Sequence, residues 1–453
     1  MSPRFARLRT RLARQCACLC LALLPGLPAL ASEPQADAAS VQDKPWDARL
    51  QSTWVRQLKT PFHAPYSGPN SLLPGRESAY TFSTTAFLGY RPQPDLEFWF
   101  NPEVVRGVPL SDLHGLGGFP NGEQQKTTGP NFTVYRARLF MRKTWSLPGE
   151  QEQIEADANQ FGQTVGRRRF VLTAGNLAVT DIFDDNTYAH DARTQFMNWA
   201  LMAHASWDYA ADARGYTWGV AGEWYHDQWA LRFGRFMQPQ ESNGLPLDTR
   251  IFKFYGDQFE VEHGHKLAGR EGKLRLLLFR NHANMGAFRD ALAAANGGTP
   301  SLDNVRRPQS KLGAGLALEQ ELSENLGLFG RANFNDGRTE TFAYTEIDRS
   351  FSAGLSAKGR WWGRANDSAG LALVRNDISA AHRDYLAAGG LGAFLGDGQL
   401  NNYGSERTLE VYYSFGLARN LWLTADFQRI VNPGYNRDRG PVSIGSLRLH
   451  FEM

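Results

Sequence analysis

Cysteine is almost absent from this chain of 453 residues. The three cysteines, Cys16, Cys18 and Cys20, all lie within the first 31 residues, which we interpret as a cleaved leader. The mature chain therefore has no cysteine. This excludes a disulfide framework, a thiolate nucleophile and a metal site with cysteine ligands.

Residues 1–31 have the pattern of a secretory signal peptide. Five arginines between Arg4 and Arg14 form a positive head, the apolar stretch Leu19–Leu30 follows, and Ala29-Leu30-Ala31 is a small-residue cleavage site. Of the 49 Lys and Arg residues, removing these five leaves 44 against 46 Asp and Glu, a formal net charge of −2. The mature chain is thus not basic overall, and we expect no nucleic-acid partner.

Long hydrophobic runs are also missing. No stretch after the leader approaches the ~20 consecutive apolar residues that a membrane-spanning helix requires. A chain of this length could form several soluble domains or one large barrel. The 45 glycines and the 12% of aromatic residues suit a β-barrel whose inward positions are polar.

Alternation of apolar and polar residues is the pattern that the chain does have. In Trp218–Trp224 and again in Trp229–Phe233, large apolar side chains alternate with small or polar ones around a turn at 226–228. Because strand side chains alternate between faces, this segment is a predicted hairpin with one apolar and one polar side. The apolar side would be the core of a soluble sandwich or the lipid-facing side of a membrane barrel.

Alternating segments recur sixteen times, and an even number of strands is what a bacterial outer-membrane barrel requires. The connections are alternately long and short, as expected of long outer loops and short periplasmic turns. We therefore predict an all-β fold, a transmembrane antiparallel β-barrel over 80–453. The predicted strands lie near 80–90, 96–101, 135–142, 168–175, 198–207, 216–225, 228–236, 257–265, 272–281, 311–320, 325–334, 350–358, 367–375, 407–416, 420–430 and 443–453.

Residues 32–79 are predicted to be a periplasmic segment outside the barrel. Its apolar residues Trp46, Leu50, Trp54 and Leu58 recur every four positions and could form one face of a short helix. At the other end of the chain, Leu447–Met453 alternates in the way expected of a closing strand.

Carboxylates and histidines raise two alternatives that involve chemistry. Asp184 or Glu223 could serve as an acid or base of a glycoside hydrolase, so a secreted carbohydrate-binding or glycoside-hydrolysing β-rich protein stays open. The acidic loop from Asp181 to Asp191 lacks the glycine and closing glutamate of a calcium loop, and His263 and His265 have no evident third zinc ligand. We therefore expect no metal and no cofactor.

Arginines on predicted inward positions point to recognition of a polar solute. Guanidinium presents fixed planar donors that can bridge neighbouring sugar hydroxyls, and inward aromatic rings can stack on a pyranose. The alternative is that these arginines only pair with inward carboxylates. Arg136 and Arg138, two residues apart on one predicted strand, are the first candidates. The remaining candidate channel-lining residues are Glu97, Trp99, Asn101, Arg142, Asp184, Arg193, Arg232 and Asp426.

Several of these motifs resemble the carbohydrate-selective outer-membrane porins of the OprB type. The residues that carry the resemblance are Glu97–Asn101, Gly118–Glu123, Tyr135–Phe140, Asp181–Met202, Trp207–Gly219 and Asp426–Gly434. The resemblance implies a channel with an arginine-rich constriction, no catalysed reaction, and a place in the outer membrane of a Gram-negative bacterium. It also implies sugars as permeating solutes, contact with outer-membrane lipid and the barrel-assembly machinery, and favours a monomer. The chain ends in Met453, where the family pattern usually ends in Phe.

Overall fold

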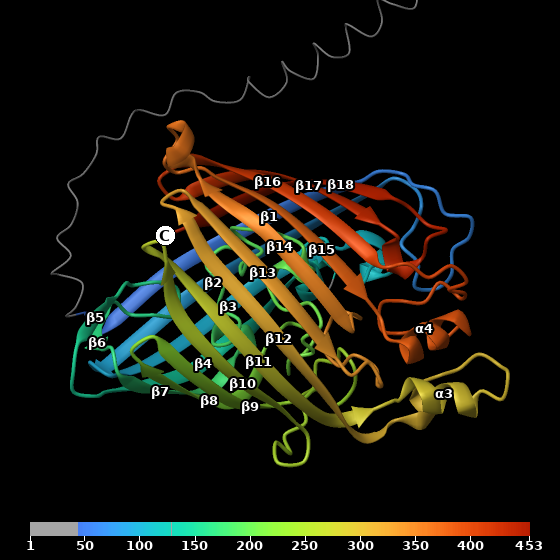
Figure 1. Ribbon diagram of the computed structural model, residues 1–453, viewed down its shortest axis with the longest axis horizontal. Coiled ribbons are helices and arrows are strands. Elements are labelled where there is room, and N and C mark those ends of the chain that lie inside the picture. Colours follow the sequence, from blue (N-terminus) through green and yellow to red (C-terminus); the bar gives the residue numbers. More distant parts are fainter. Residues whose placement is uncertain (1–43, 128) are drawn as a thin grey trace, which may run out of the picture. The chain divides into compact units, whose positions relative to one another are not determined.

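Antiparallel strands make up most of the chain that the computed structural model describes, residues 44–127 and 129–453 (Figure 1). Within these ranges sixteen strands close into one barrel, in the order β1-β18-β17-β16-β15-β14-β13-β12-β11-β10-β9-β8-β7-β4-β3-β2. No helix in the described residues is long and apolar enough to cross a membrane. The predicted signal peptide, residues 1–31, lies outside the described residues.

The barrel strands and the smaller elements have the following bounds. The barrel strands are β1 (Trp46–Lys59), β2 (Glu77–Gln93), β3 (Leu96–Val108), β4 (Gly129–Ser146), β7 (Arg169–Leu177), β8 (Thr217–His226), β9 (Trp229–Met237), β10 (Tyr255–Leu267), β11 (Arg270–Met285), β12 (Arg307–Ser323), β13 (Leu326–Asn335), β14 (Arg349–Lys358), β15 (Ser368–Asp377), β16 (Glu406–Ala418), β17 (Leu421–Val431) and β18 (Val442–Glu452). A separate two-stranded sheet consists of β5 (Gln151–Ile154) and β6 (Gln163–Gly166). The α-helices are α2 (Trp199–Met202), α3 (Phe288–Ala294) and α4 (Ala380–Ala387), and the 3₁₀-helices are Leu110–Leu113, Gln124–Lys126, Val179–Asp181, Asp303–Val305, Gly359–Trp362 and Pro433–Tyr435.

The barrel begins at Trp46, so the prediction of a helix in 32–79 and of a barrel boundary at 80 was wrong. Strand β1 pairs with β2 on one side and with β18 on the other, and Trp54 lies opposite Phe82 and Leu449. Apolar residues four apart share a face in a strand as well as in a helix, because four is a multiple of the strand period of two. The spacing alone could not distinguish the two.

The predicted strand at 198–207 was also wrong. It contains α2 and lies in the long connection between β7 and β8. Almost all of its residues are buried. A segment that is buried on every side shows no hydrophobic period, so its sequence pattern could not distinguish a strand from a helix. These two errors cancel, and the predicted count of sixteen is confirmed.

The exposure of alternate residues shows an apolar exterior and a polar interior. In β18, Leu447 and Leu449 are 49% and 38% exposed. Arg448 and His450, which alternate with them along the strand, are 0% and 2% exposed. A soluble sandwich would bury the leucines. The pattern is that of a barrel whose outer wall contacts lipid, and this confirms the predicted fold class.

The two ends of the barrel differ in their connections. At one end five connections have two residues each, at 94–95, 227–228, 268–269, 324–325 and 419–420. The two longer connections at this end are 359–367 and 147–168, and the second carries the β5–β6 hairpin. The other end carries the long connections 60–76, 109–128, 178–216, 238–254, 286–306, 336–348, 378–405 and 432–441.

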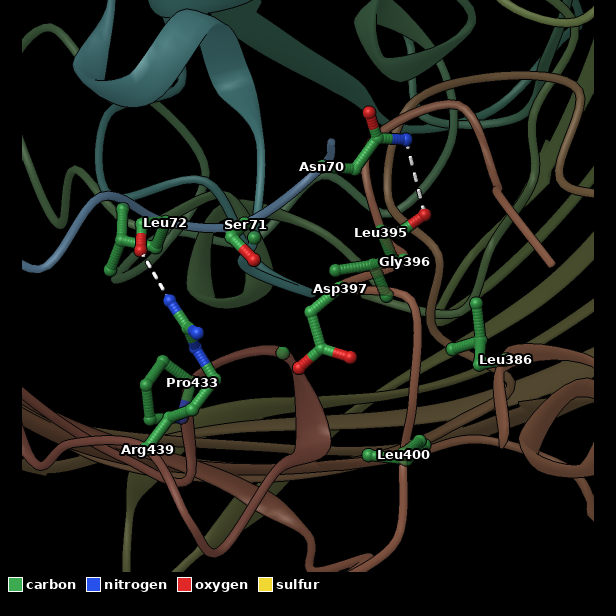
Figure 2. Close-up of a pocket in the computed structure, with 12 residues that line it drawn as sticks. Asn70, Ser71, Leu72, Leu386, Leu395, Gly396, Asp397, Leu400, Pro433 and Arg439 are labelled. Atoms are coloured by element: carbon green, nitrogen blue, oxygen red, sulfur yellow. Dashed lines mark hydrogen bonds between the residues drawn. The ribbon is translucent and has the colours of Figure 1, made fainter. Parts of the chain in front are cut away.

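Three of the long connections are tied to one another near a small pocket (Figure 2). Arg439 of 432–441 donates to the carbonyl oxygen of Leu72 at 2.6 Å, and Asn70 of 60–76 donates to the carbonyl oxygen of Leu395 at 3.2 Å. The pocket holds about 10 Å³, which is room for a water molecule but not for a sugar. It therefore contributes to loop packing and is no solute site.

Helices α3 and α4 pack against each other at the same end. The ring of His382 in α4 stacks on Phe288 of α3 with centroids 4.3 Å apart, and its Nδ1 lies 3.1 Å from Asp348 Oδ2. Burial lowers the pKa of His382, but the carboxylates of Asp348 and Glu346 raise it more, to about 9. At neutral pH the imidazolium of His382 therefore joins the connection 378–405 to the connection 336–348, which carries both carboxylates.

We expect this packing to weaken in alkali. Because the pKa of His382 in the folded state is above its ordinary value, its stabilisation of the fold is fully present below about pH 6.5 and is lost as the pH rises through about 9. The stabilisation that is lost is about 3 kcal/mol. Limited proteolysis of 378–405 should therefore accelerate between pH 7 and pH 10. His382→Gln should remove this dependence, whereas His226→Gln at the opposite end should retain it. Equal pH profiles for the wild type and His382→Gln would contradict this role.

Candidate functional site: the barrel interior

The connection 178–216 begins at the end of β7, folds into the barrel and returns to β8. Its side chains are mostly buried, and Phe183 and Phe196 are 0% exposed. Polar contacts join it to strands around the whole interior, including β1, β3, β10, β12, β13, β16 and β18. This connection therefore narrows the lumen and is held from all sides.

An ion pair between Asp184 and Arg331 of β13 is one of its deepest anchors. Arg331 Nε donates to Asp184 Oδ1 at 3.0 Å, both side chains are fully buried, and Asp184 Oδ2 accepts the backbone N–H of His204 at 2.7 Å. Burial raises the pKa of Asp184, but the guanidinium of Arg331 and the neighbouring rings of His204 and His190 together lower it below its ordinary value. The carboxylate is thus ionised and bonded on both oxygens. It anchors the loop and does not line the channel, so the predicted solute contact of Asp184 was wrong.

Backbone groups of the same connection bind wall residues elsewhere. Glu410 of β16 accepts the N–H groups of Met197 and Asn198 at 2.5 and 3.0 Å. Arg448 of β18 donates to two carbonyl oxygens, those of Ala192 at 2.8 Å and Gln195 at 2.7 Å. Inward polar side chains of the wall therefore satisfy backbone groups of the connection that would otherwise be buried without partners.

A second connection, 109–128, also enters the barrel. Phe119 packs edge-on against Trp199 with ring centroids 6.0 Å apart. The backbone N–H groups of Gly117 and Gly118 both donate to Glu406 at 3.0 Å. A side chain is barely tolerated at Gly118, because a Cβ there would lie 3.1 Å from Ala200. The two inward connections thus pack on each other inside the barrel.

Arg193 joins these connections to the wall. Its guanidinium lies 2.8 Å from Glu103 of β3 and 3.0 Å from Glu123 of the second connection, and Lys126 pairs with the same two carboxylates at 3.9 and 3.3 Å. Arg193 is 8% exposed. This predicted candidate therefore lies in a buried charge network, beside the channel wall and not free in the lumen.

Arg138 of β4 and Asp181 of the connection 178–216 form a partly exposed ion pair. Arg138 Nε and Nη2 donate to the two oxygens of Asp181 at 2.7 and 2.6 Å, and the side chains are 16% and 25% exposed. The guanidinium lies 5.3 Å from the ring centroid of Tyr216. Although burial raises the pKa of Asp181, the cation of Arg138, the backbone N–H of Ala178 and the ring of His190 together lower it below its ordinary value. The pair thus presents fixed donors and acceptors, and the buried ring of Tyr216 supports the guanidinium.

Arg136 does not share this face, so the prediction that the two arginines act together was wrong. Arg138 lies opposite Asn101 of β3, but Arg136 lies opposite Pro102, because Ala137 is an extra residue in a β-bulge. Directly opposed residues share a face, and Asn101 is inward while Pro102 is outward. Arg136 stands on the outer wall, where its guanidinium lies 5.1 Å from the ring of Trp218.

Four other predicted candidates are covered by the connection 147–168. Trp99 is 1% exposed and packs on Phe161, with ring centroids 5.0 Å apart. Asn101 Nδ2 and Arg142 Nη1 both donate to Asn159, at 2.8 Å each. Glu97 accepts from Trp99 and Gln163. Of these four, only Arg142 remains 18% exposed. Trp99, Asn101 and Glu97 hold this connection inside the barrel mouth and are not free to bind a solute.

The last two candidates, Arg232 and Asp426, are buried. Arg232 of β9 is 6% exposed and pairs with Glu223, Glu260 and Glu262 at 3.3, 2.7 and 3.2 Å. Asp426 of β17 is 5% exposed. Both side chains are therefore buried, and the alternative that inward arginines pair with wall carboxylates holds for Arg232.

The prediction missed Asp181, Tyr216 and Lys126 as members of the site. Asp181 was noticed only as part of an acidic loop, because nothing local links it to Arg138, 43 residues earlier. Lys126 lies in a loop with no alternation to assign its direction. Within the described residues no group of three or more His, Asp or Glu side chains is arranged to hold a metal ion.

Comparison with known proteins identifies the family. The model of the carbohydrate-selective porin family, OprB, matches residues 89–453, most of the chain. The chain belongs to this family. The porin family and the barrel fold are those of a channel and not of an enzyme, and Asp184 and Glu223, the two residues considered as hydrolytic acids, are held in ion pairs with Arg331 and Arg232. The predicted family, fold and porin function are therefore confirmed.

Solved structures with the same fold include OprB of Pseudomonas putida in two forms. Its high-pH structure matches this porin with a TM-score of 0.68 at 17% sequence identity, over 92% of this chain and 96% of that chain. Its low-pH structure matches with a TM-score of 0.50 at 12% identity, over 92% and 95% of the two chains. No curated protein sequence matches the chain.

Proposed function

We propose that this porin lies in the outer membrane of a Gram-negative bacterium and lets sugars diffuse passively into the periplasm through a constriction beside Arg138 and Asp181. The single observation that carries this site is the bidentate pair of Arg138 and Asp181, whose side chains are 16% and 25% exposed. The long connections would face the outside, as in other barrels of this kind.

The pair suits a neutral polyhydroxylated solute. Guanidinium donates to hydroxyl oxygens, carboxylate accepts from hydroxyl hydrogens, and both are already oriented by their mutual hydrogen bonds. A sugar can thus exchange water for protein hydrogen bonds without a full desolvation penalty. Because the two charges neutralise each other, the pair offers little net attraction to a small ion. Binding stays weak enough for the solute to leave.

Two measurements test the proposal. Cell fractionation should place the mature chain in the detergent-extractable outer membrane, and a freely soluble periplasmic chain would contradict it. Liposome swelling with the purified porin should be faster for monosaccharides than for amino acids of similar size. Equal rates for the two solute classes would contradict carbohydrate selection at this constriction.

Arg138→Ala is expected to relax this selectivity, with Arg136→Ala as a matched control. Removing Arg138 deletes donors and volume at the constriction, whereas Arg136 lies on the outer wall across the bulge at Ala137. Losing one hydrogen bond to the sugar, worth about 1 kcal/mol net, should lower the sugar-to-amino-acid ratio of swelling rates about fivefold. Ion conductance should rise in the first variant only. Identical swelling-rate ratios in both correctly folded variants would show that Arg138 does not contact the permeating sugar.

A further inference from the structure

Four arginines on adjacent strands face outward at the end of the barrel that carries the long connections. They are exposed and lie within three residues of the strand ends on β14, β15, β16 and β17, which run side by side in Figure 1. The members of this cluster, which we call the outer arginine patch, are Arg349, Arg375, Arg407 and Arg429.

The pairing register brings the four side chains together. Arg375 lies directly opposite Arg407. Arg375 also lies opposite Phe351, two residues from Arg349, and Leu409, two residues from Arg407, lies opposite Arg429. Directly opposed side chains have Cβ atoms about 5 Å apart and diagonal ones about 7–8 Å apart. Two or more guanidinium groups can therefore reach one small anion.

The protein itself neutralises little of this charge. Asp377, the carboxylate that pairs within the patch, lies 2.9 Å from Arg375 Nε and also accepts from Tyr403 and Ser405. Arg429 donates to the hydroxyl of Ser443 at 2.7 Å. Arg349 lies directly opposite Asp377, but among the described residues neither Arg349 nor Arg407 has a side-chain hydrogen bond or ion pair. Like charges directly opposite each other destabilise a sheet. We therefore expect an external anion to stabilise this arrangement.

An apolar wall continues from the patch toward the middle of the barrel. On the same outward face, Phe351 and Leu373 are each 61% exposed, Phe427 is 45% and Val411 is 41% exposed. Bulky apolar side chains follow the arginines directly along β14, β15, β16 and β17. Cations at the rim and apolar side chains below match an amphiphile with an anionic head and acyl chains.

We propose that the outer arginine patch binds the phosphorylated headgroup of an outer-leaflet glycolipid, with the acyl chains lying along Phe351, Leu373, Val411 and Phe427. Guanidinium matches phosphate oxygens bidentately, and a headgroup with two phosphates can engage all four arginines. A second copy of the chain does not fit, because a twofold contact would bring the same cations together. The inference requires the outer-membrane location proposed above, but not the sugar-selecting role of Arg138.

Arg235 of β9 provides a matched control. It also faces outward near the end of its strand, but its Nε and Nη2 both donate to Asp257, at 2.7 Å each. Its charge is thus already satisfied by the protein. Replacing it removes an outward arginine without touching the patch.

The test uses the mature porin purified in a non-ionic detergent and measures binding of diphosphorylated lipid A by native mass spectrometry. We expect Arg375→Gln/Arg407→Gln to weaken binding at least tenfold and Arg235→Gln to change it by less than twofold. The wild type should bind dephosphorylated lipid A at least tenfold more weakly than the diphosphorylated form. Equal binding by the double variant, or equal binding of the dephosphorylated lipid, would overturn the proposal, as would full competition by millimolar inorganic phosphate.

Thermal unfolding separates lipid binding from a purely structural role. Without lipid, the double variant should have a Tm equal to or above that of the wild type, because the repulsion between Arg375 and Arg407 is relieved. With diphosphorylated lipid A, its Tm should rise less than that of the wild type. A lower Tm without lipid, together with an unchanged rise on adding lipid, would assign the arginines to folding and overturn the proposal. Sugar swelling rates should be the same in both proteins, so a failure here is distinguishable from a failure of the sugar site.

Discussion

Asp184→Ala is expected to release the inward connection and open the pore. The substitution leaves Arg331 fully buried without its carboxylate, and breaking a buried ion pair in this way costs about 3–5 kcal/mol. The connection also loses the bond between Asp184 Oδ2 and the N–H of His204. Because this segment narrows the lumen, its displacement should raise single-channel conductance severalfold and abolish preference among small solutes.

Asp185→Ala is the control for this change. Asp185 is the next residue, but its side chain is exposed and has no hydrogen bond or ion pair among the described residues. Planar-bilayer recordings of both variants should therefore differ, with Asp185→Ala close to the wild type in conductance. An unaltered conductance in Asp184→Ala would show that the remaining anchors, at Glu410 and Arg448, hold the connection without this pair.

Deleting Leu447–Met453 is expected to prevent barrel assembly altogether. Strand β18 closes the barrel by pairing with β1 and with β17, for example through Leu449, which lies opposite both Trp54 and Leu423. The truncation leaves two strand edges in hydrocarbon, where each unsatisfied backbone group costs several kcal/mol. No heat-modifiable folded band should appear on electrophoresis of outer membranes.

Met453→Phe should assemble normally and serves as the control for the truncation. Met453 lies just beyond β18, is 65% exposed and exchanges two backbone hydrogen bonds with Leu50, which any residue there can make. Phenylalanine would keep an apolar residue at this end. A truncated chain that still forms a heat-resistant barrel would refute the closing role of β18.

The sequence by itself determined most of the strands, the faces of most of their residues and the resemblance to the family. Alternation is a local property, so Leu447, Arg448 and Leu449 already indicate which side chains face outward, whatever the partner strand. It also correctly placed Arg138 and Arg232 inside. The absence of cysteine and of long apolar runs excluded a disulfide scaffold and a helical span without any tertiary information.

Only the tertiary structure decided which inward residues a solute can reach. The bulge at Ala137 turns Arg136 outward, and it depends on the register with β3, which no local pattern records. Asp184 became an anchor because folding of 178–216 brings it to Arg331, 147 residues away. Trp99 became inaccessible because Phe161 covers it. Alternation fixes the direction of a side chain, whereas its accessibility depends on which distant segments fold over it.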